Sequence, residues 1–262
     1  MYDDVVWWAA QTRRALWLSA LVFGVACGSS ENTNSVRDAR ETKNNMSEGS
    51  DAGSPAGVAG DTVAAPSTAR TPVVLFFGTS LTAGYGLSPE QAFPSLIEKK
   101  ARDEGVPIKV VNAGLSGETT AGAVRRIDWV LRTPADLVVI EGGANDALRG
   151  LSPAAAKANL EKLIAAVRAR QPEAKIALIQ MEAPPNYGVA YTRSFRSIYA
   201  DVARQEKVPL LPFLLDSVAG IPRLNQADGV HPNVAGERIV ADNVWRALKP
   251  IVEQLDRAGK RG

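Results

Sequence analysis

Short apolar runs and amphipathic stretches alternate along the chain after residue 70. The apolar runs have the length of β-strands, and the first of them is apolar at every position, as fully buried strands are. Five strands are predicted, at Val73–Phe77, Ile108–Val111, Ala135–Ile140, Lys175–Gln180 and Val208–Phe213. The stretches between them repeat apolar residues every three to four positions, which predicts helices. These are expected at Gln91–Glu104, Thr119–Leu131, Pro153–Arg170 (capped by Ser152), Thr192–Glu206 and Asn233–Leu255.

The strict alternation of strands and helices predicts an α/β fold, because parallel strands need a helical crossover between them. We expect a flavodoxin-like, three-layer sandwich with about five parallel strands and helices on both faces of the sheet. No internal repeat interrupts this order. Residues 71–262 are therefore expected to form one domain.

The pattern is absent from residues 28–70. This segment contains no Leu, Ile, Phe, Trp or Tyr and is rich in small and polar residues. Such a composition cannot bury enough apolar surface to offset the entropy that ordering costs. We expect a disordered tether in front of the folded domain.

The first 27 residues have the pattern of a secretory signal. Arg13 and Arg14 precede the apolar run Ala15–Ala26, which is too short to span a bilayer comfortably. Cys27, the only cysteine, follows this run, and the local sequence resembles a bacterial lipoprotein signal, in which the cysteine is lipidated. The expected location is the periplasmic face of a bacterial membrane, held by a lipid anchor at Cys27. The alternative is an ordinary signal peptide and a periplasmic or secreted protein.

Charge and motifs exclude several classes of function. Residues 71–262 hold 24 Lys and Arg against 20 Asp and Glu, a net charge of +4 that is too mild to indicate nucleic-acid binding. The sequence has no Gly-rich phosphate-binding motif and no His/Cys cluster with metal-ligand spacing. Neither a cofactor nor a metal is expected.

Candidate catalytic chemistry follows the strands. Ser80 stands just past the first strand, and Gly-bearing loops follow the second and third, at 114–119 and 141–146. The carboxyl ends of parallel strands meet at one edge of a sheet, where ligands bind in open α/β folds. A serine there can act as a nucleophile if a base lies beside it.

His231 is the only histidine in the chain and is therefore the natural candidate for that base. Asp228 lies three residues before it, so that a tight turn would bring the carboxylate to the imidazole. Asp216 is a rival for the same role, at a greater distance along the chain. A lone histidine on the surface or at a helix start would have no such role.

Four blocks in this order resemble the SGNH (GDSL) hydrolase family, over nearly all of residues 73–250. The blocks are Gly78-Thr79-Ser80-Leu81, Ser116-Gly117-Glu118-Thr119, Gly143-Ala144-Asn145-Asp146 and Asp228 with His231. The resemblance implies a catalytic triad of Ser80, His231 and Asp228. It also implies an oxyanion hole made by the backbone N–H groups of Ser80 and Gly117 and by the Asn145 amide. Asp146 is expected to serve structure rather than catalysis.

The chain departs from the family at Thr79, where aspartate is usual; this position is not catalytic, so we expect activity to survive. The runs 183–188 and 208–213 look like those of arylesterases, acyl thioesterases and lysophospholipases of the family. The resemblance thus implies a serine esterase acting on acyl esters, with a small-molecule or lipid ester as substrate. The alternatives are an O-deacetylase of cell-wall or other carbohydrates and, in another class, a non-catalytic binding lipoprotein.

Overall fold

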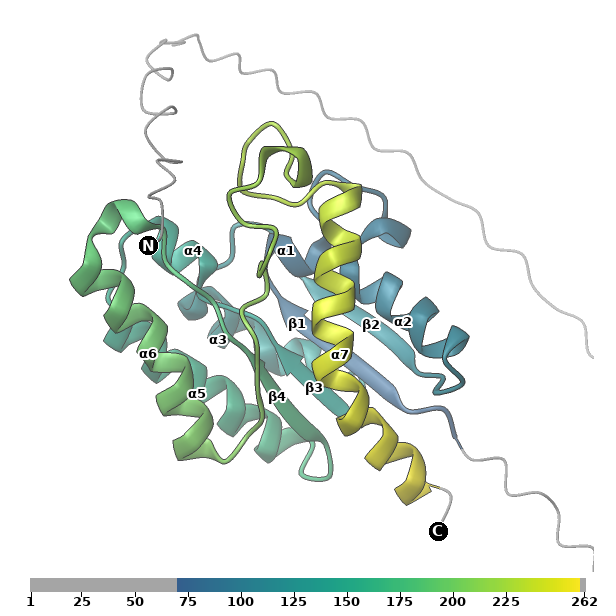
Figure 1. The fold of residues 1–262 in the computed structure, drawn as a ribbon. Helices are drawn as coiled ribbons and strands as arrows, with labels where there is room; N and C mark the ends of the chain where they lie inside the picture. Colours follow the sequence, from purple (N-terminus) through teal and green to yellow (C-terminus); the bar gives the residue numbers. More distant parts are fainter. Residues whose placement is uncertain (1–69, 260–262) are drawn as a thin grey trace, which may run out of the picture. The chain divides into compact units, whose positions relative to one another are not determined.

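The computed structural model describes residues 70–259 (Figure 1). Five strands form one sheet in the order β2-β1-β3-β4-β5, and every neighbouring pair is parallel. The strands are β1 (Val73–Gly78), β2 (Lys109–Gly114), β3 (Leu137–Ile140), β4 (Lys175–Ile179) and β5 (Leu210–Leu211). The predicted α/β class is confirmed, and the strand order is the flavodoxin-like one. The predicted signal 1–27, with Cys27, and residues 28–69 of the predicted tether lie outside the described residues.

Seven α-helices surround this sheet in the described part of the chain. α2 and α7 pack together on one face, and α3, α5 and α6 pack on the other, as right-handed crossovers require (Figure 1). Their bounds are α1 (Ser80–Ala83), α2 (Phe93–Asp103), α3 (Thr120–Val130), α4 (Ala144–Leu148), α5 (Pro153–Arg170), α6 (Val189–Glu206) and α7 (Val234–Gly259). Among these helices, none is long and apolar enough for a membrane span.

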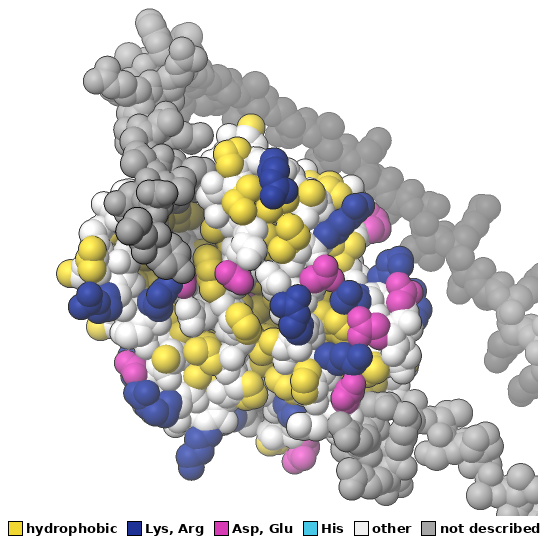
Figure 2. Space-filling model, in the orientation of Figure 1, with side chains coloured by type: hydrophobic (Ala, Val, Ile, Leu, Met, Phe, Trp, Pro, Cys, Tyr) yellow, Lys and Arg dark blue, Asp and Glu magenta, His cyan; other side chains and the backbone are white. Residues whose placement is uncertain are grey.

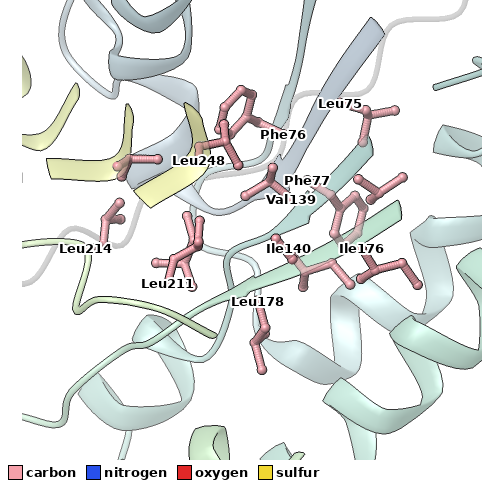
Figure 3. Close-up of a cluster of buried hydrophobic side chains, with 14 of the residues drawn as sticks. Leu75, Phe76, Phe77, Val139, Ile140, Ile176, Leu178, Leu211, Leu214 and Leu248 are labelled. Atoms are coloured by element: carbon pink, nitrogen blue, oxygen red, sulfur yellow. The ribbon is translucent and has the colours of Figure 1, made fainter. Parts of the chain in front are cut away.

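The sheet is buried from both sides, which explains the unbroken apolar runs. Leu137, Val138, Val139 and Ile140 of β3 are each 1% exposed or less. Figure 3 shows part of this core: Phe76 of β1 lies beside Leu248 of α7, and Leu211 and Leu214 lie at and after β5. On the face drawn in Figure 2, Lys and Arg side chains lie among Asp and Glu, and no large surface of one sign forms.

Several predicted elements differ from the observed ones by a few residues at their ends, and two of these differences have a clear local cause. The fifth strand was expected over 208–213, but β5 covers only Leu210–Leu211. Pro209 and Pro212 flank it, and proline has no N–H to donate to a sheet ladder. α6 begins at Val189, three residues earlier than expected, because Gly188 with φ of 84° turns the chain directly into the helix.

β1 and β3 are adjacent in the sheet. The chain passes from β1 to β2 on one side of this pair and from β3 to β4 on the other side, so the strand order reverses between β1 and β3. Phe77 near the end of β1 pairs with Ile140, the last residue of β3. The crevice outside such a pair of strands is where ligands bind in this fold. The loops after β1 and β3 therefore meet at the place where a site is expected.

One buried carboxyl joins α2 to α7. Glu237 of α7 is 2% exposed, and it accepts a hydrogen bond of 2.7 Å from the backbone N–H of Phe93, the first residue of α2. Burial raises the pKa of Glu237 to about 8, against an ordinary value of 4.5. Between these two values the folded protein holds a proton that the unfolded chain has lost.

We therefore predict that the free energy of unfolding falls as the pH rises from about 4.5 to about 8, by up to about 1.4 kcal/mol per pH unit from this group. Glu237→Gln keeps an acceptor for Phe93 but cannot ionise, so it should flatten this dependence and stabilise the protein most at pH 8. Urea unfolding at several pH values measures it. Glu173→Gln, at an exposed position, is the control. An unchanged slope in Glu237→Gln would contradict the prediction.

Candidate active site

Ser80 lies on a sharp turn between a strand and a helix. β1 ends at Gly78, Thr79 caps the next helix, and Ser80 is the first residue of α1. A Cβ atom on Gly78 would lie 2.1 Å from Thr82 Oγ1, so no side chain fits there. As the first residue of a helix, Ser80 has a backbone N–H without an acceptor in that helix.

Glu141, directly after β3, accepts hydrogen bonds from this turn. Its carboxyl is 2% exposed and accepts hydrogen bonds from the Thr79 N–H (2.7 Å), the Thr79 hydroxyl (2.9 Å) and the Thr82 hydroxyl (2.9 Å). Burial raises the pKa of Glu141 above its usual value, and these donors oppose the rise. The Thr79 hydroxyl thus donates a hydrogen bond to the Glu141 carboxyl. The aspartate that is usual at this position would instead place a second carboxyl beside Glu141.

His231 lies beside Ser80. Its Nε2 is 2.9 Å from Ser80 Oγ, and its Nδ1 is 2.7 Å from Asp228 Oδ2. With the carboxylate at Nδ1, the neutral ring carries its proton there, and Nε2 is left to accept from the serine hydroxyl. The structure brings together the three residues that the sequence analysis grouped, across 151 positions between Ser80 and His231.

Asp228 also shapes the loop on which it lies. Its Oδ1 accepts from the backbone N–H groups of Val230 (2.9 Å) and His231 (3.0 Å), which closes the tight turn. Desolvation raises the pKa of Asp228, but the hydrogen bonds from His231 and Val230 outweigh it and leave the pKa below its usual value. The carboxylate is therefore ionised at neutral pH. The rival Asp216 lies elsewhere, where its backbone carbonyl accepts from Asn243.

The expected oxyanion donors line the same cavity as the serine and histidine, of about 220 Å³. Asn145 donates one amide hydrogen to the Glu118 carbonyl (3.0 Å), which fixes the direction of the side chain. Gly117 has a φ of 76°, a conformation that side chains rarely allow, and its carbonyl accepts from Arg149 (3.1 Å). Asn145 and Gly117 are thus each held in place by a hydrogen bond to a neighbouring residue.

One ion pair and two hydrogen bonds behind these loops connect them to α3. The Glu118 carboxylate, 6% exposed, pairs with Arg126 at 2.6 Å. Asp146 accepts from the Thr120 N–H (2.8 Å) and hydroxyl (2.6 Å), which joins the loop after β3 to the start of α3. Asp146 therefore contacts the scaffold rather than His231 or Ser80.

A second, apolar cavity of about 410 Å³ adjoins the first. The two share Leu81, Ala144, Leu148 and Val230 as lining residues. The rest of the apolar lining comes from segments after β4 and β5, and includes Met181, Ala183, Phe213, Leu215 and Ile221. Ala183 and Phe213 lie in the runs 183–188 and 208–213 that the sequence singles out, whereas Met181, Leu215 and Ile221 are apolar positions without a motif. Among the described residues, no group of three or more His, Cys, Asp or Glu is arranged to hold a metal ion.

A serine hydroxyl bonded to a histidine, itself held by an ionised carboxylate at the carboxyl edge of a parallel sheet, defines the class of α/β serine hydrolases. Comparison with known proteins gives the family. The family model of the GDSL-like Lipase/Acylhydrolase family matches residues 76–239. The chain belongs to this family, as its four blocks predicted.

Three similar relatives carry names of ester-hydrolysing enzymes. Esterase TesA of Pseudomonas aeruginosa is 42% identical over 70% of this chain and 91% of the relative. The arylesterase of Vibrio mimicus is 37% identical over 67% and 87%. Thioesterase 1/protease 1/lysophospholipase L1 of Escherichia coli is 35% identical over 70% and 86%.

Solved structures agree with the fold. The crystal structure of TesA, 42% identical, covers 68% of this chain and 99% of its own, with a TM-score of 0.65. The psychrotrophic esterase EstA from Pseudoalteromonas sp., inhibited by monoethylphosphonate, is 33% identical and covers 70% and 99%, with a TM-score of 0.66. The chain is therefore an ester hydrolase by family, and its fold matches the solved structures of these two esterases.

Proposed function

We propose that this protein is a serine esterase that cleaves fatty-acyl esters with Ser80, His231 and Asp228 as its triad. The observation that carries the proposal is the 2.9 Å contact between Ser80 Oγ and His231 Nε2 beside an apolar cavity. Ser80 Oγ attacks the acyl carbon while His231 takes its proton, and the imidazolium then protonates the leaving alcohol. Water, deprotonated by the same histidine, attacks the acyl-enzyme, and Ser80 recovers its proton.

Three donors stabilise the negative oxygen that develops in each step. They are the backbone N–H groups of Ser80 and Gly117 and the free amide hydrogen of Asn145. Preorganised donors of this kind are effective because they need no rearrangement as charge appears. The contacts of Asn145 with Glu118 and of Arg149 with Gly117 support this preorganisation.

The apolar cavity favours acyl chains over acetylated carbohydrates. Burial of each CH₂ group contributes about 0.8 kcal/mol, so a chain of eight or more carbons gains substantially there. An acetyl group would leave the cavity empty, and a sugar would find few polar partners in it. Lysophospholipids and acyl thioesters, which the name of the Escherichia coli relative suggests as substrates, present an acyl chain to such a cavity, and so do aryl esters of longer acids.

Ser80→Ala and His231→Ala should each lower kcat/KM for p-nitrophenyl octanoate at least about 1000-fold in a folded protein, because each removes a member of one catalytic unit. Labelling of Ser80 by a fluorophosphonate should vanish in Ser80→Ala. Circular dichroism checks the fold, and Ser194→Ala, at an exposed position on α6, is the serine control. Wild-type rates in folded His231→Ala would exclude the mechanism. An unlabelled, inactive wild type would favour a binding protein.

Filling the apolar cavity should change the preference for acyl length. Ala219 lines this cavity and is exposed, so Ala219→Trp should narrow it without unfolding the protein. We expect kcat/KM for p-nitrophenyl octanoate to fall about 10-fold or more while that for p-nitrophenyl acetate changes less than about twofold. Ala219→Ser is the matched control. Equal losses on both esters would show that the acyl chain lies elsewhere.

We further propose that residues 1–27 direct export and that Cys27 is lipidated, so that the esterase stands at the periplasmic face of a bacterial membrane. The proposal is supported by Arg13, Arg14 and the apolar run before the cysteine. Two or more acyl chains on one cysteine hold a protein stably on a bilayer. The polar composition of residues 28–70 suits a tether between anchor and domain.

Cys27→Ser should abolish incorporation of a clickable fatty acid into the protein and should leave kcat/KM for soluble esters unchanged. The first effect follows from loss of the acceptor thiol, and the second from its position outside the catalytic domain. Gel fluorescence after metabolic labelling measures the first, with Ser29→Ala as the control. An unlabelled wild type found soluble in the periplasm or the medium would point to a plain secreted enzyme.

A further inference from the structure

The two halves of the proposed triad come from different loops. Asp228 and His231 lie on one loop and are joined within it, so the aspartate orients the imidazole but cannot set its distance from Ser80. That distance depends on contacts between the histidine loop, 225–232, and the nucleophile turn, 79–86. Two residues outside the triad, Tyr85 and Gln226, supply such contacts.

Gln226 connects both loops through one side-chain nitrogen. Its Nε2 donates to the Tyr85 carbonyl (2.7 Å) on the nucleophile turn and to the Pro232 carbonyl (2.9 Å) next to the histidine. Its backbone N–H donates to the His231 carbonyl (2.8 Å). A Cβ on Gly86 would lie 2.4 Å from Gln226 Oε1, so the glycine leaves room for this amide.

Tyr85 lies against the imidazole itself. The two ring centroids are 4.6 Å apart with an angle of 38° between the planes. The backbone N–H of Tyr85 donates to the Ser80 carbonyl (3.0 Å), which ties the ring position to the nucleophile. The aromatic ring thus limits rotation and displacement of His231 from the side that faces the turn.

We propose that Tyr85 and Gln226 are positioning residues that hold His231 Nε2 at Ser80 Oγ. This inference rests on the proposed triad and assigns to it two further residues. A displacement of about 1 Å between reacting groups can lower the rate about 100-fold. The contacts act on the approach of base and nucleophile, so they affect kcat rather than KM.

Tyr85→Leu and Gln226→Leu should each lower kcat for p-nitrophenyl acetate about 10- to 100-fold and change KM less than about threefold. Tyr85→Phe keeps the ring and should recover most of the loss seen in Tyr85→Leu. Trp129→Leu replaces an aromatic residue that is 67% exposed on α3, away from the site, and is the control for basal activity. Tyr85 is 52% exposed, so its variants should fold even where Gln226→Leu does not.

A double-mutant cycle with His231→Ala separates positioning from direct contact with the substrate. If Tyr85 acts through the imidazole, adding Tyr85→Leu to His231→Ala should leave the residual rate unchanged. A further loss equal to that in the wild-type background would overturn the proposal, as would a pure KM effect. If kcat stays at the wild-type value in Tyr85→Leu and Gln226→Leu while His231→Ala is inactive, the positioning roles of Tyr85 and Gln226 are excluded and the triad stands. If His231→Ala is active, the triad itself is excluded.

Discussion

The hydrogen bonds between the buried Glu141 carboxyl and the turn after β1 connect the two strands on which the site is built. β1 and β3 are neighbours in the sheet, and the last residues of each lead into the serine turn and the asparagine loop. Three donors from Thr79 and Thr82 meet one carboxyl that is almost without solvent. A polar group left without a hydrogen bond at this buried carboxyl would raise the free energy of the folded protein. The turn therefore has one favourable geometry, and this geometry sets the orientation of Ser80.

The glycine and asparagine loops follow the same principle, since each carries a candidate oxyanion donor and is fixed by a group outside the proposed triad and oxyanion hole. The pair of Glu118 with Arg126 holds the glycine loop, and Asp146 holds the asparagine loop against α3. The histidine loop differs, because its own aspartate both closes the turn and orients the ring. The histidine loop contacts the serine turn through Gln226 and Tyr85, and these contacts are more exposed to solvent than those of Glu141.

The sequence predicts the sheet and the candidate catalytic residues because both leave a local signal. Unbroken apolar runs mark β1 and β3, and four short blocks mark the loops after the strands. Glu141, Tyr85 and Gln226 leave no such signal, since the contacts that give them a role join distant segments. Thr82 lies 59 positions from Glu141, and Tyr85 lies 141 positions from Gln226. The apolar cavity was also not predictable, because its lining residues come from several segments and look like core positions. β5 was predicted too long because two prolines limit its pairing, and residues 1–69 were not tested by the structure.

The position of the histidine loop near the end of the chain orders events during synthesis. The serine turn, the glycine and asparagine loops and all five strands of the sheet leave the ribosome before residue 228. On the proposed mechanism, Ser80 has no base until the loop with Asp228 and His231 lies beside it, and until then its hydroxyl is an ordinary alcohol. On the proposed mechanism, esterase activity is therefore a property of the completed domain, and a chain that ends before residue 228 lacks it.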